Sequence, residues 1–331
     1  MTGEWVADPG IGWRILLTAY LSEPPDPGAV LGRLTELSAQ QQWHGTTEVR
    51  SDDDVDPLRA RLIDGSAPVL TGIAGAALVV SAHHAWVDGL GLLDVLAAAT
   101  GQPVASSARG VGERPTRGGP ARTATRRLAE AAFRPPATVA APSGAVGSGD
   151  AFAELTVPGS WRTAEVVTAT VQGILRHNDA AGRDTRHLAV AVGAGRTRPG
   201  DDDRIANRSA LIRLTDLEDA SADEVEDRLH TAPLEAAPTS GRAATARLMA
   251  GGIRLLSRRL GSTLLVSHLG EVTAEGTTGL AFHPVTAGGT GLSLGAVGFR
   301  GSTTLTLRAR AGQWDRPGLD GLLSEIATEL G

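Results

Sequence analysis

The chain has 331 residues, of which 41% are hydrophobic and 21% charged, and its formal net charge is -6. This length exceeds the size at which a single hydrophobic core usually stops growing, so we expect two lobes. The composition is that of an ordinary globular protein, which excludes wholesale disorder, and the 31 basic residues are scattered among 37 acidic ones, which disfavours a nucleic-acid surface.

Cysteine is absent, and all of the basic residues are arginine because no lysine occurs. These absences exclude thiol nucleophiles, disulfides, Schiff bases and the lysine of a phosphate loop. No apolar stretch is long enough for a membrane span, and residues 1–13 carry no basic leader, so we expect a cytoplasmic protein. The alanine-, glycine- and arginine-rich composition is typical of a bacterial gene of high GC content.

The first lobe, expected over residues 1–120, opens with apolar and helical patterns that alternate along the chain. A β-type run precedes a helical pattern, and a β-rich stretch with a buried end precedes an apolar helix that stops at Gly101. The sequence predicts strands over 13–20 and within 68–82, and helices over 29–40, 56–64 and 90–100. Residues 102–120 lack periodicity and are rich in Gly, Ser, Pro and Arg, which indicates a linker or crossover.

The second lobe is expected over 151–331, after a linker or crossover at 121–150 that contains one possible helix. Its patterns again alternate between strand and helix, which argues for an α/β or α+β sandwich. We expect helices over 122–133, 163–176, 222–229, 242–260 and 319–330, and strands over 151–157, 187–192, 210–214, 263–267, 291–295 and 303–308.

The segment most indicative of chemistry is His83-His84-Ala85-Trp86-Val87-Asp88-Gly89, between the buried strand and the apolar helix. Neighbouring strand residues point to opposite faces, so only one of the two histidines can face a given cleft. An imidazole is mostly neutral at pH 7 and can act as a general base. Asp88 is able either to orient the imidazole, as in a triad, or to hold the turn, while Gly89 permits unusual backbone geometry.

This segment resembles the HHxxxDG signature of the chloramphenicol-acetyltransferase-like superfamily, which includes nonribosomal peptide condensation domains and polyketide-associated acyltransferases. All four fixed positions match. Three further segments are similar to family motifs and extend the resemblance over most of the chain: residues 190–196, which end in Arg196, residues 206–208, and Leu265-Val266-Ser267-His268-Leu269-Gly270.

The resemblance implies two similar lobes with a channel between them, in which an acyl thioester and an acceptor meet. It assigns His84 as the catalytic base and His83 as its support, and it implies that Asp88 forms a structural ion pair with Arg196. The donor would be an acyl group on coenzyme A or on a phosphopantetheine carrier protein, and the acceptor a small-molecule hydroxyl or amine. No permanently bound cofactor is implied.

The chain also departs from the family pattern. It is shorter than many members, and it lacks the Asp-Phe-Gly-Trp-Gly motif of the plant-type branch. His268 replaces the usual asparagine and Ala206 the usual glycine. Besides His268, the channel candidates are Trp86, Ser267 and Asn207. A packing role explains Trp86 equally well, and local hydrogen bonding to the main chain explains Ser267 better.

No metal site is expected, since the histidines lack ligand spacing, and no dinucleotide fingerprint follows a strand. The sequence therefore favours acyl transfer in natural-product or lipid biosynthesis, with His84 as base. Two alternatives stay open. One is a condensation-like enzyme that catalyses cyclisation, hydrolysis or another proton transfer, and the other is a catalytically silent module that binds carrier proteins.

Overall fold

The computed structural model describes residues 13–45, 47–112, 114–115, 126, 129–130, 133–142, 144–145, 147–196, 204–235, 261–286 and 291–331. The helix expected over 242–260 lies outside these residues, as does most of the helix expected over 122–133. Among the described residues, no helix has both the length and the apolar character needed to cross a membrane.

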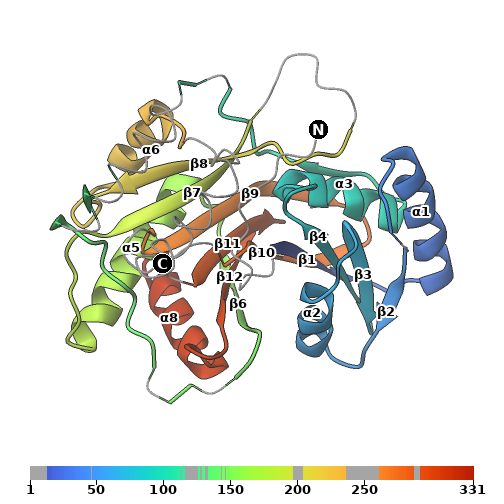
Figure 1. The fold of residues 1–331 in the computed structure, drawn as a ribbon, viewed down its shortest axis with the longest axis horizontal. Coiled ribbons are helices and arrows are strands. Elements are labelled where there is room, and N and C mark those ends of the chain that lie inside the picture. The colour runs from blue at the N-terminus through green and yellow to red at the C-terminus, as the bar shows by residue number, and fades with distance from the viewer. Residues whose placement is uncertain are drawn as a thin grey trace, which may run out of the picture.

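Two sheets and the helices packed on them form two lobes (Figure 1). The elements are β1 (Arg14–Leu21), α1 (Pro27–Gln40), β2 (Val49–Ser51), α2 (Val55–Ile63), β3 (Val69–Ala74), β4 (Ala77–His83), α3 (Gly89–Thr100), β5 (Val104–Ser106), β6 (Asp150–Pro158), α5 (Thr163–Ala180), β7 (Ala189–Gly195), β8 (Ser209–Thr215), α6 (Ala222–Thr231), β9 (Leu264–Ala274), β10 (Thr277–His283), β11 (Leu292–Phe299), β12 (Ser302–Arg310) and α8 (Arg316–Thr328). The predicted two-lobed α/β class is confirmed.

The first lobe contains a sheet with the strand order β10-β1-β4-β3-β2. Both faces of β1 and β4 are buried, because α1 and α3 pack on one face while α2 packs on the other. This double burial explains why β4 is an almost continuous apolar run with no polar alternation. At its C-terminal end, α3 stops at Gly101, whose φ of 71° is a left-handed conformation that glycine adopts without strain.

The second lobe contains a sheet with the strand order β6-β12-β11-β9-β7-β8, and β5 pairs with β9 beside this path. Helices α5, α6 and α8 pack on one another and on this sheet. The apolar face of α5, which includes Val167, Val171 and Ile174, lies in the same core as Leu322 and Ile326 of α8. The spacing of these residues places them on one side of each helix.

Each lobe takes a strand from the other half of the sequence. β10 pairs with β1 over the register Leu16↔His283 to Leu21↔Thr277, and β5 pairs with β9. The division of the chain into segments 1–120, 121–150 and 151–331 stays a prediction. The two sheets do not follow this division, because β5 and β10 each join the sheet of the other lobe. The two lobes are therefore joined by main-chain hydrogen bonds as well as by side-chain packing.

A buried arginine adds a polar connection at this junction. Arg308 on β12 is fully buried, and its Nη1 donates to the carbonyl oxygens of Arg14 on β1 (2.6 Å) and of Pro284 after β10 (3.2 Å). Its Nε and Nη2 contact Asp150 Oδ2 at 2.7 and 2.6 Å. Burial lowers the pKa of Arg308, while Asp150 acts in the opposite direction. One guanidinium thus links β12 and β6 to the first strand of the other lobe.

The strand and helix expectations agree with the structure over most of the described chain. The largest differences are that β2 and β10 were not predicted, that β5 lies in the stretch expected to be a linker, and that β9 extends seven residues beyond the predicted end at residue 267. Both β5 and the added part of β9 pair with each other. These strands owe their form to partners that are distant in sequence.

Candidate functional site

The HHxxxDG segment forms the turn between β4 and α3, and the turn fixes the orientation of His84. Its main-chain amide donates to Trp13 O (2.7 Å), and its ring Nδ1 lies 3.0 Å from Val87 O. A carbonyl oxygen only accepts, so Nδ1 carries the proton in the neutral ring and Nε2 keeps a lone pair. Burial lowers the pKa of His84 below 6.5, although the Val87 carbonyl and Asp88 partly oppose this. His84 is therefore neutral near pH 7.

His83 occupies a different environment, as the alternation of a strand requires. It pairs with Arg14 on β1, and its Nδ1 accepts from the amide of Ala85 at 3.2 Å. Burial, followed by the nearby charge of Arg14, lowers the pKa of His83. His84 lines a cavity of about 690 Å³, whereas His83 does not.

Asp88 holds the turn against the second lobe through main-chain amides. Its Oδ1 accepts from Gly91 N at 2.9 Å and caps α3, and its Oδ2 accepts from Arg208 N at 2.8 Å. The expected ion pair with Arg196 is not formed: no such contact occurs between these two described residues. The position facing Asp88 is taken by the Arg208 amide, because β7 and β8 continue their pairing through Arg196 N and Arg208 O (2.7 Å).

Replacing Asp88 with asparagine should lower the free energy of unfolding by about 1–3 kcal/mol, because the new amide nitrogen cannot accept and one of the two buried main-chain N–H groups loses its partner. Urea denaturation measures this. The matched control is Asp26→Asn at the exposed N-cap of α1, where Asp and Asn are equivalent. An Asp88→Asn protein that is as stable as the wild type yet inactive would instead favour the triad role.

Gly89 is needed for close approach between the lobes rather than for an unusual backbone angle, since its φ is not positive. A Cβ at this position would lie 2.7 Å from Leu269 Cδ2 and 3.3 Å from Phe282 Cζ. A larger residue would therefore have to displace the terminal methyl group of Leu269. The expectation that Gly89 adopts an unusual backbone geometry is therefore wrong, and its small size is instead a packing requirement.

A cavity of about 690 Å³ lies where the second sheet splits. β7 and β9 pair in parallel only from Val190↔Leu264 to Gly193↔Ser267, after which β7 stays with β8 while β9 stays with β11 and β5. Side chains from both sides of the sheet consequently line one space. His84 and Leu90 line it on the side of the first lobe, and Thr163 and Leu229 line it on the side of α5 and α6.

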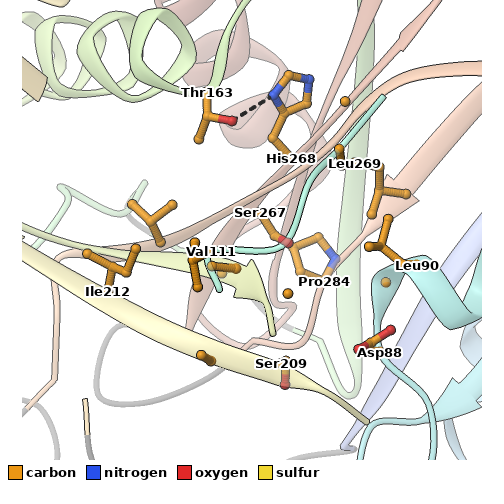
Figure 2. Close-up of a pocket in the computed structure, with 18 of the residues that line it drawn as sticks. Asp88, Leu90, Val111, Thr163, Ser209, Ile212, Ser267, His268, Leu269 and Pro284 are labelled. Carbon is orange, nitrogen blue, oxygen red and sulfur yellow. Dashed lines mark hydrogen bonds between the residues drawn. The ribbon is translucent and has the colours of Figure 1, made fainter. Parts of the chain in front are cut away.

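Ser267 and His268 lie at this split and point to opposite sides of β9 (Figure 2). Ser267 lies toward Pro284, and its hydroxyl has no hydrogen-bond partner among the described residues. His268 Nδ1 lies 3.1 Å from Thr163 Oγ1, and burial lowers the pKa of His268 to about 4. Its Nε2 is buried without a partner in the described structure. A ring of this kind stays neutral and cannot serve as a base that becomes protonated near pH 7.

Two of the predicted channel residues do not line the cavity. Trp86 is instead partly buried and packs against the hydrophobic core of the first lobe. Asn207 accepts from Ser209 N (2.9 Å) and Ser209 Oγ, so its side chain stabilises the start of β8. The sequence also missed residues 107–111, which line the cavity although they lack any pattern, and no sequence signal marks them.

The fold was compared with known proteins. No family model and no curated protein matches the sequence. Among solved structures, the EpoB cyclization-docking bidomain from Sorangium cellulosum matches 99% of this chain and 81% of its own, with a TM-score of 0.59 and 13% identity. A starter condensation domain of rhizomide synthetase RzmA, in complex with C8-CoA, matches 97% and 89% with a TM-score of 0.56 and 12% identity.

The first condensation domain of the calcium-dependent antibiotic synthetase, in complex with a substrate analogue, matches 98% of this chain and 92% of its own, with a TM-score of 0.55 and 14% identity. The chain has the condensation-domain fold. This is the chloramphenicol-acetyltransferase-like fold that the resemblance predicted. In this condensation-domain fold, the turn carrying His84 faces a cavity to which both lobes contribute.

The described part of this condensation-domain fold contains no group of three or more His, Asp or Glu side chains arranged to hold a metal ion. More of the cavity surface is apolar than polar, which is usual for a small-molecule site, and charged side chains are also present in the lining. His84, Asp88, Ser267, His268 and Arg196 all line it. These side chains can supply acid–base catalysis and hydrogen bonding.

Proposed function

We propose that this protein transfers an acyl group from a coenzyme A or carrier-protein thioester to a hydroxyl or amine, with His84 as the general base. One observation carries the proposal: Val87 O engages Nδ1 of His84, which leaves the lone pair of Nε2 on a side chain that lines the cavity. The main-chain bond to Trp13 and the Asp88 brace keep this ring in place. A base held in this way can remove a proton without a metal.

In the proposed reaction, Nε2 of His84 takes the proton from the acceptor hydroxyl or amine as its oxygen or nitrogen attacks the thioester carbonyl. The new bond gives a tetrahedral oxyanion, to which the hydroxyl of Ser267, another residue of the cavity lining, would donate a hydrogen bond. Collapse breaks the C–S bond, and the departing sulfur takes the proton from the His84 imidazolium. The products are an ester or amide and a free thiol, and no covalent acyl-enzyme forms.

The shape of the cavity supports two substrates. It extends from the turn of the first lobe through the split between β7 and β9 to the start of α5. The related RzmA domain was solved with C8-CoA, and the calcium-dependent antibiotic synthetase domain with a substrate analogue. By analogy, an acyl thioester would reach His84 from one side and the acceptor from the other.

The test follows loss of the thioester and acylation of the acceptor in the same reaction. Candidate acyl-CoA and acyl-pantetheine donors are offered with panels of amines and hydroxyl compounds, using the wild type and the folded variants His84→Gln and His84→Ala. The proposal expects both signals to depend on His84. Equal acylation by a folded His84 variant would refute it.

The pH dependence of the reaction provides a separate prediction. The base works in its neutral form, so kcat/KM should rise as pH passes upward through the pKa of His84. Because burial lowers this pKa below 6.5, the half-maximal point should lie below pH 6.5 and the profile should be flat near pH 7. The measurement uses a hydroxyl acceptor, which does not itself ionise in this range. A half-maximal point above pH 6.5 would contradict the assignment.

A folding control must accompany this profile. His268 has a pKa of about 4 in the fold but an ordinary value when unfolded. Between these values the unfolded chain binds more protons, so the folded state loses stability as the pH falls from about 6.5 toward 4. Circular dichroism at each pH separates loss of the base from loss of the fold.

A cyclisation reaction is a second candidate, since the fold is also similar to the EpoB cyclization-docking bidomain. It would use the same base but join two groups of one substrate. Loss of thioester with formation of a cyclic product, in the absence of any separate acceptor, would favour it. A third candidate, a silent carrier-binding module, predicts that His84→Ala leaves the pathway product unchanged.

A further inference from the structure

The charged side chains around the cavity differ in whether they have partners. Each carboxylate accepts at least one hydrogen bond: Asp88 from Gly91 and Arg208, Glu226 from His230, Glu235 from Arg126, and Glu271 from Ser160. Arg114 donates to Leu229 O, and Arg162 pairs with Glu165. Arg109 and Arg196 also line the cavity, but neither side chain has a hydrogen bond or ion pair with any residue that the structure describes.

The main chain of Arg196 is connected by two hydrogen bonds to the turn that carries His84. Its amide donates to Arg208 O at 2.7 Å, and the amide of Arg208 donates to Asp88 at 2.8 Å. Asp88 directly follows Val87, whose carbonyl holds the ring of His84. No ion pair joins Asp88 to the Arg196 guanidinium, and the buried Arg196 Nε has no hydrogen-bond partner among the described residues.

Arg109 lies on a segment that runs beside Arg196. Val111 N donates to Gly195 O at 2.9 Å, so the chain two residues after Arg109 is bonded to the residue just before Arg196. Ser107 N donates to Glu271 O at 2.8 Å and fixes the other end of the same segment. Figure 2 places Val111 among the residues around the cavity. Two guanidinium groups without a partner among the described residues, on the exposed Arg109 and the partly buried Arg196, thus come from adjoining segments of the cavity wall.

An unpaired guanidinium at a cavity wall favours an anionic oxygen ligand, because its planar set of N–H donors matches a carboxylate or a phosphate. Such a group could belong to either substrate of the proposed reaction. In an α-amino or α-hydroxy acid, one carbon separates the carboxylate from the nucleophile. In a pantetheine thioester, the phosphate is many bonds away from the reacting carbonyl. The closeness of Arg196 to the His84 turn therefore favours a carboxylate on the acceptor.

We propose that Arg196, with Arg109 beside it, forms a carboxylate-binding subsite and that the acceptor is a free α-amino or α-hydroxy acid. This inference rests on the proposed function and narrows its acceptor. The neutral amine or the hydroxyl of the bound acid gives its proton to His84 and attacks the thioester carbonyl, the C–S bond breaks, and the thiolate takes the proton. The products are an N-acyl or O-acyl acid and a thiol.

Equilibrium binding tests the subsite without turnover. Titration calorimetry and saturation-transfer NMR would use the twenty L-amino acids and L-lactate. Each acid is compared with its carboxamide, in which an uncharged amide group of similar shape replaces the carboxylate. We expect at least one acid to bind 10-fold or more tightly than its amide. Arg196→Gln should reduce this preference by about 10–100-fold, the range of a charged hydrogen bond, and Arg109→Gln should reduce it less.

Arg186→Gln is the matched control, since Arg186 is exposed and pairs with Asp184 far from the cavity lining; it should keep the full preference. Equal binding of acids and amides, binding of no acid in the panel, or a preference that survives Arg196→Gln in a folded protein would overturn the subsite. Comparison of phosphopantetheine with pantetheine tests the other source: if Arg196→Gln weakens only phosphopantetheine, the carboxylate assignment is wrong.

The outcomes separate this inference from the proposed function. If no acid-selective binding occurs while thioester loss still depends on His84, only the subsite fails. If an acid binds through Arg196 but no thioester is consumed with any donor, the subsite stands and acyl transfer fails.

Discussion

Replacing His84 with alanine is expected to lower the rate of acyl transfer by about 10²–10⁴-fold, the usual contribution of a positioned general base. The ring accounts for one hydrogen bond, to Val87 O, so the variant should still fold. The loss should appear in kcat, because the base acts on the proton in the transition state rather than in substrate binding. Stopped-assay measurement of both products, with matched circular dichroism spectra, checks this.

The control for this variant is His44→Ala. His44 is an exposed histidine of the same lobe, outside the cavity, and no contact of its ring is recorded in the described structure. Its removal should leave the rate within twofold of the wild type. A His84→Ala protein that is folded and equally fast would exclude His84 as the base, whereas a parallel loss in the His44 variant would indicate an unspecific effect.

Replacing Arg308 with leucine is expected to lower the free energy of unfolding by about 3–5 kcal/mol, since removal of one partner from a buried ion pair leaves the other charge uncompensated. The change leaves the Asp150 carboxylate without its cationic partner. It also removes the hydrogen-bond donor to the carbonyl oxygens of Arg14 and Pro284. Urea denaturation measures the loss. For a domain of this size, the melting temperature should also fall by several degrees.

A double variant separates charge from packing at the same place. Asp150→Leu combined with Arg308→Leu removes both charges, so it should recover part of the stability that the single Arg308 variant loses. Arg316→Leu is the surface control: its pairs with Asp56 and Asp320 are largely exposed and should contribute less than 1 kcal/mol. If the Arg308 variant were as stable as this control, the junction would not depend on the buried guanidinium.

Local pattern was enough to predict the elements around His84. The apolar run of β4, the helical spacing of the apolar residues of α3 and the stop at Gly101 are each visible in a short stretch of sequence. β10 had no comparable signal, because it becomes a strand through pairing with β1 from the opposite end of the sequence. Pairing over such separations is set by the tertiary fold and not by local propensity.

The individual hydrogen bonds of the candidate site also could not be predicted from the sequence. The motif identified His84 and Asp88, but the partner of Asp88 is a main-chain amide of Arg208, which no side-chain identity reveals. The expected partner, Arg196, lies across from Arg208 with its side chain left unpaired within the described structure. The resemblance to the family predicted that Asp88 and Arg196 lie near each other. It could not predict that Asp88 accepts its hydrogen bond from the amide of Arg208 instead.

The exchange of β5 and β10 also bears on how the protein is made. During synthesis the edge of β1 that pairs with β10 stays open until residue 283 has left the ribosome, because β10 ends there. An unpaired edge of this kind invites aggregation. The wall of the cavity contributed by β9 and the residues after β10 arrives equally late. A nascent chain therefore carries His84 before the cavity that it lines is complete.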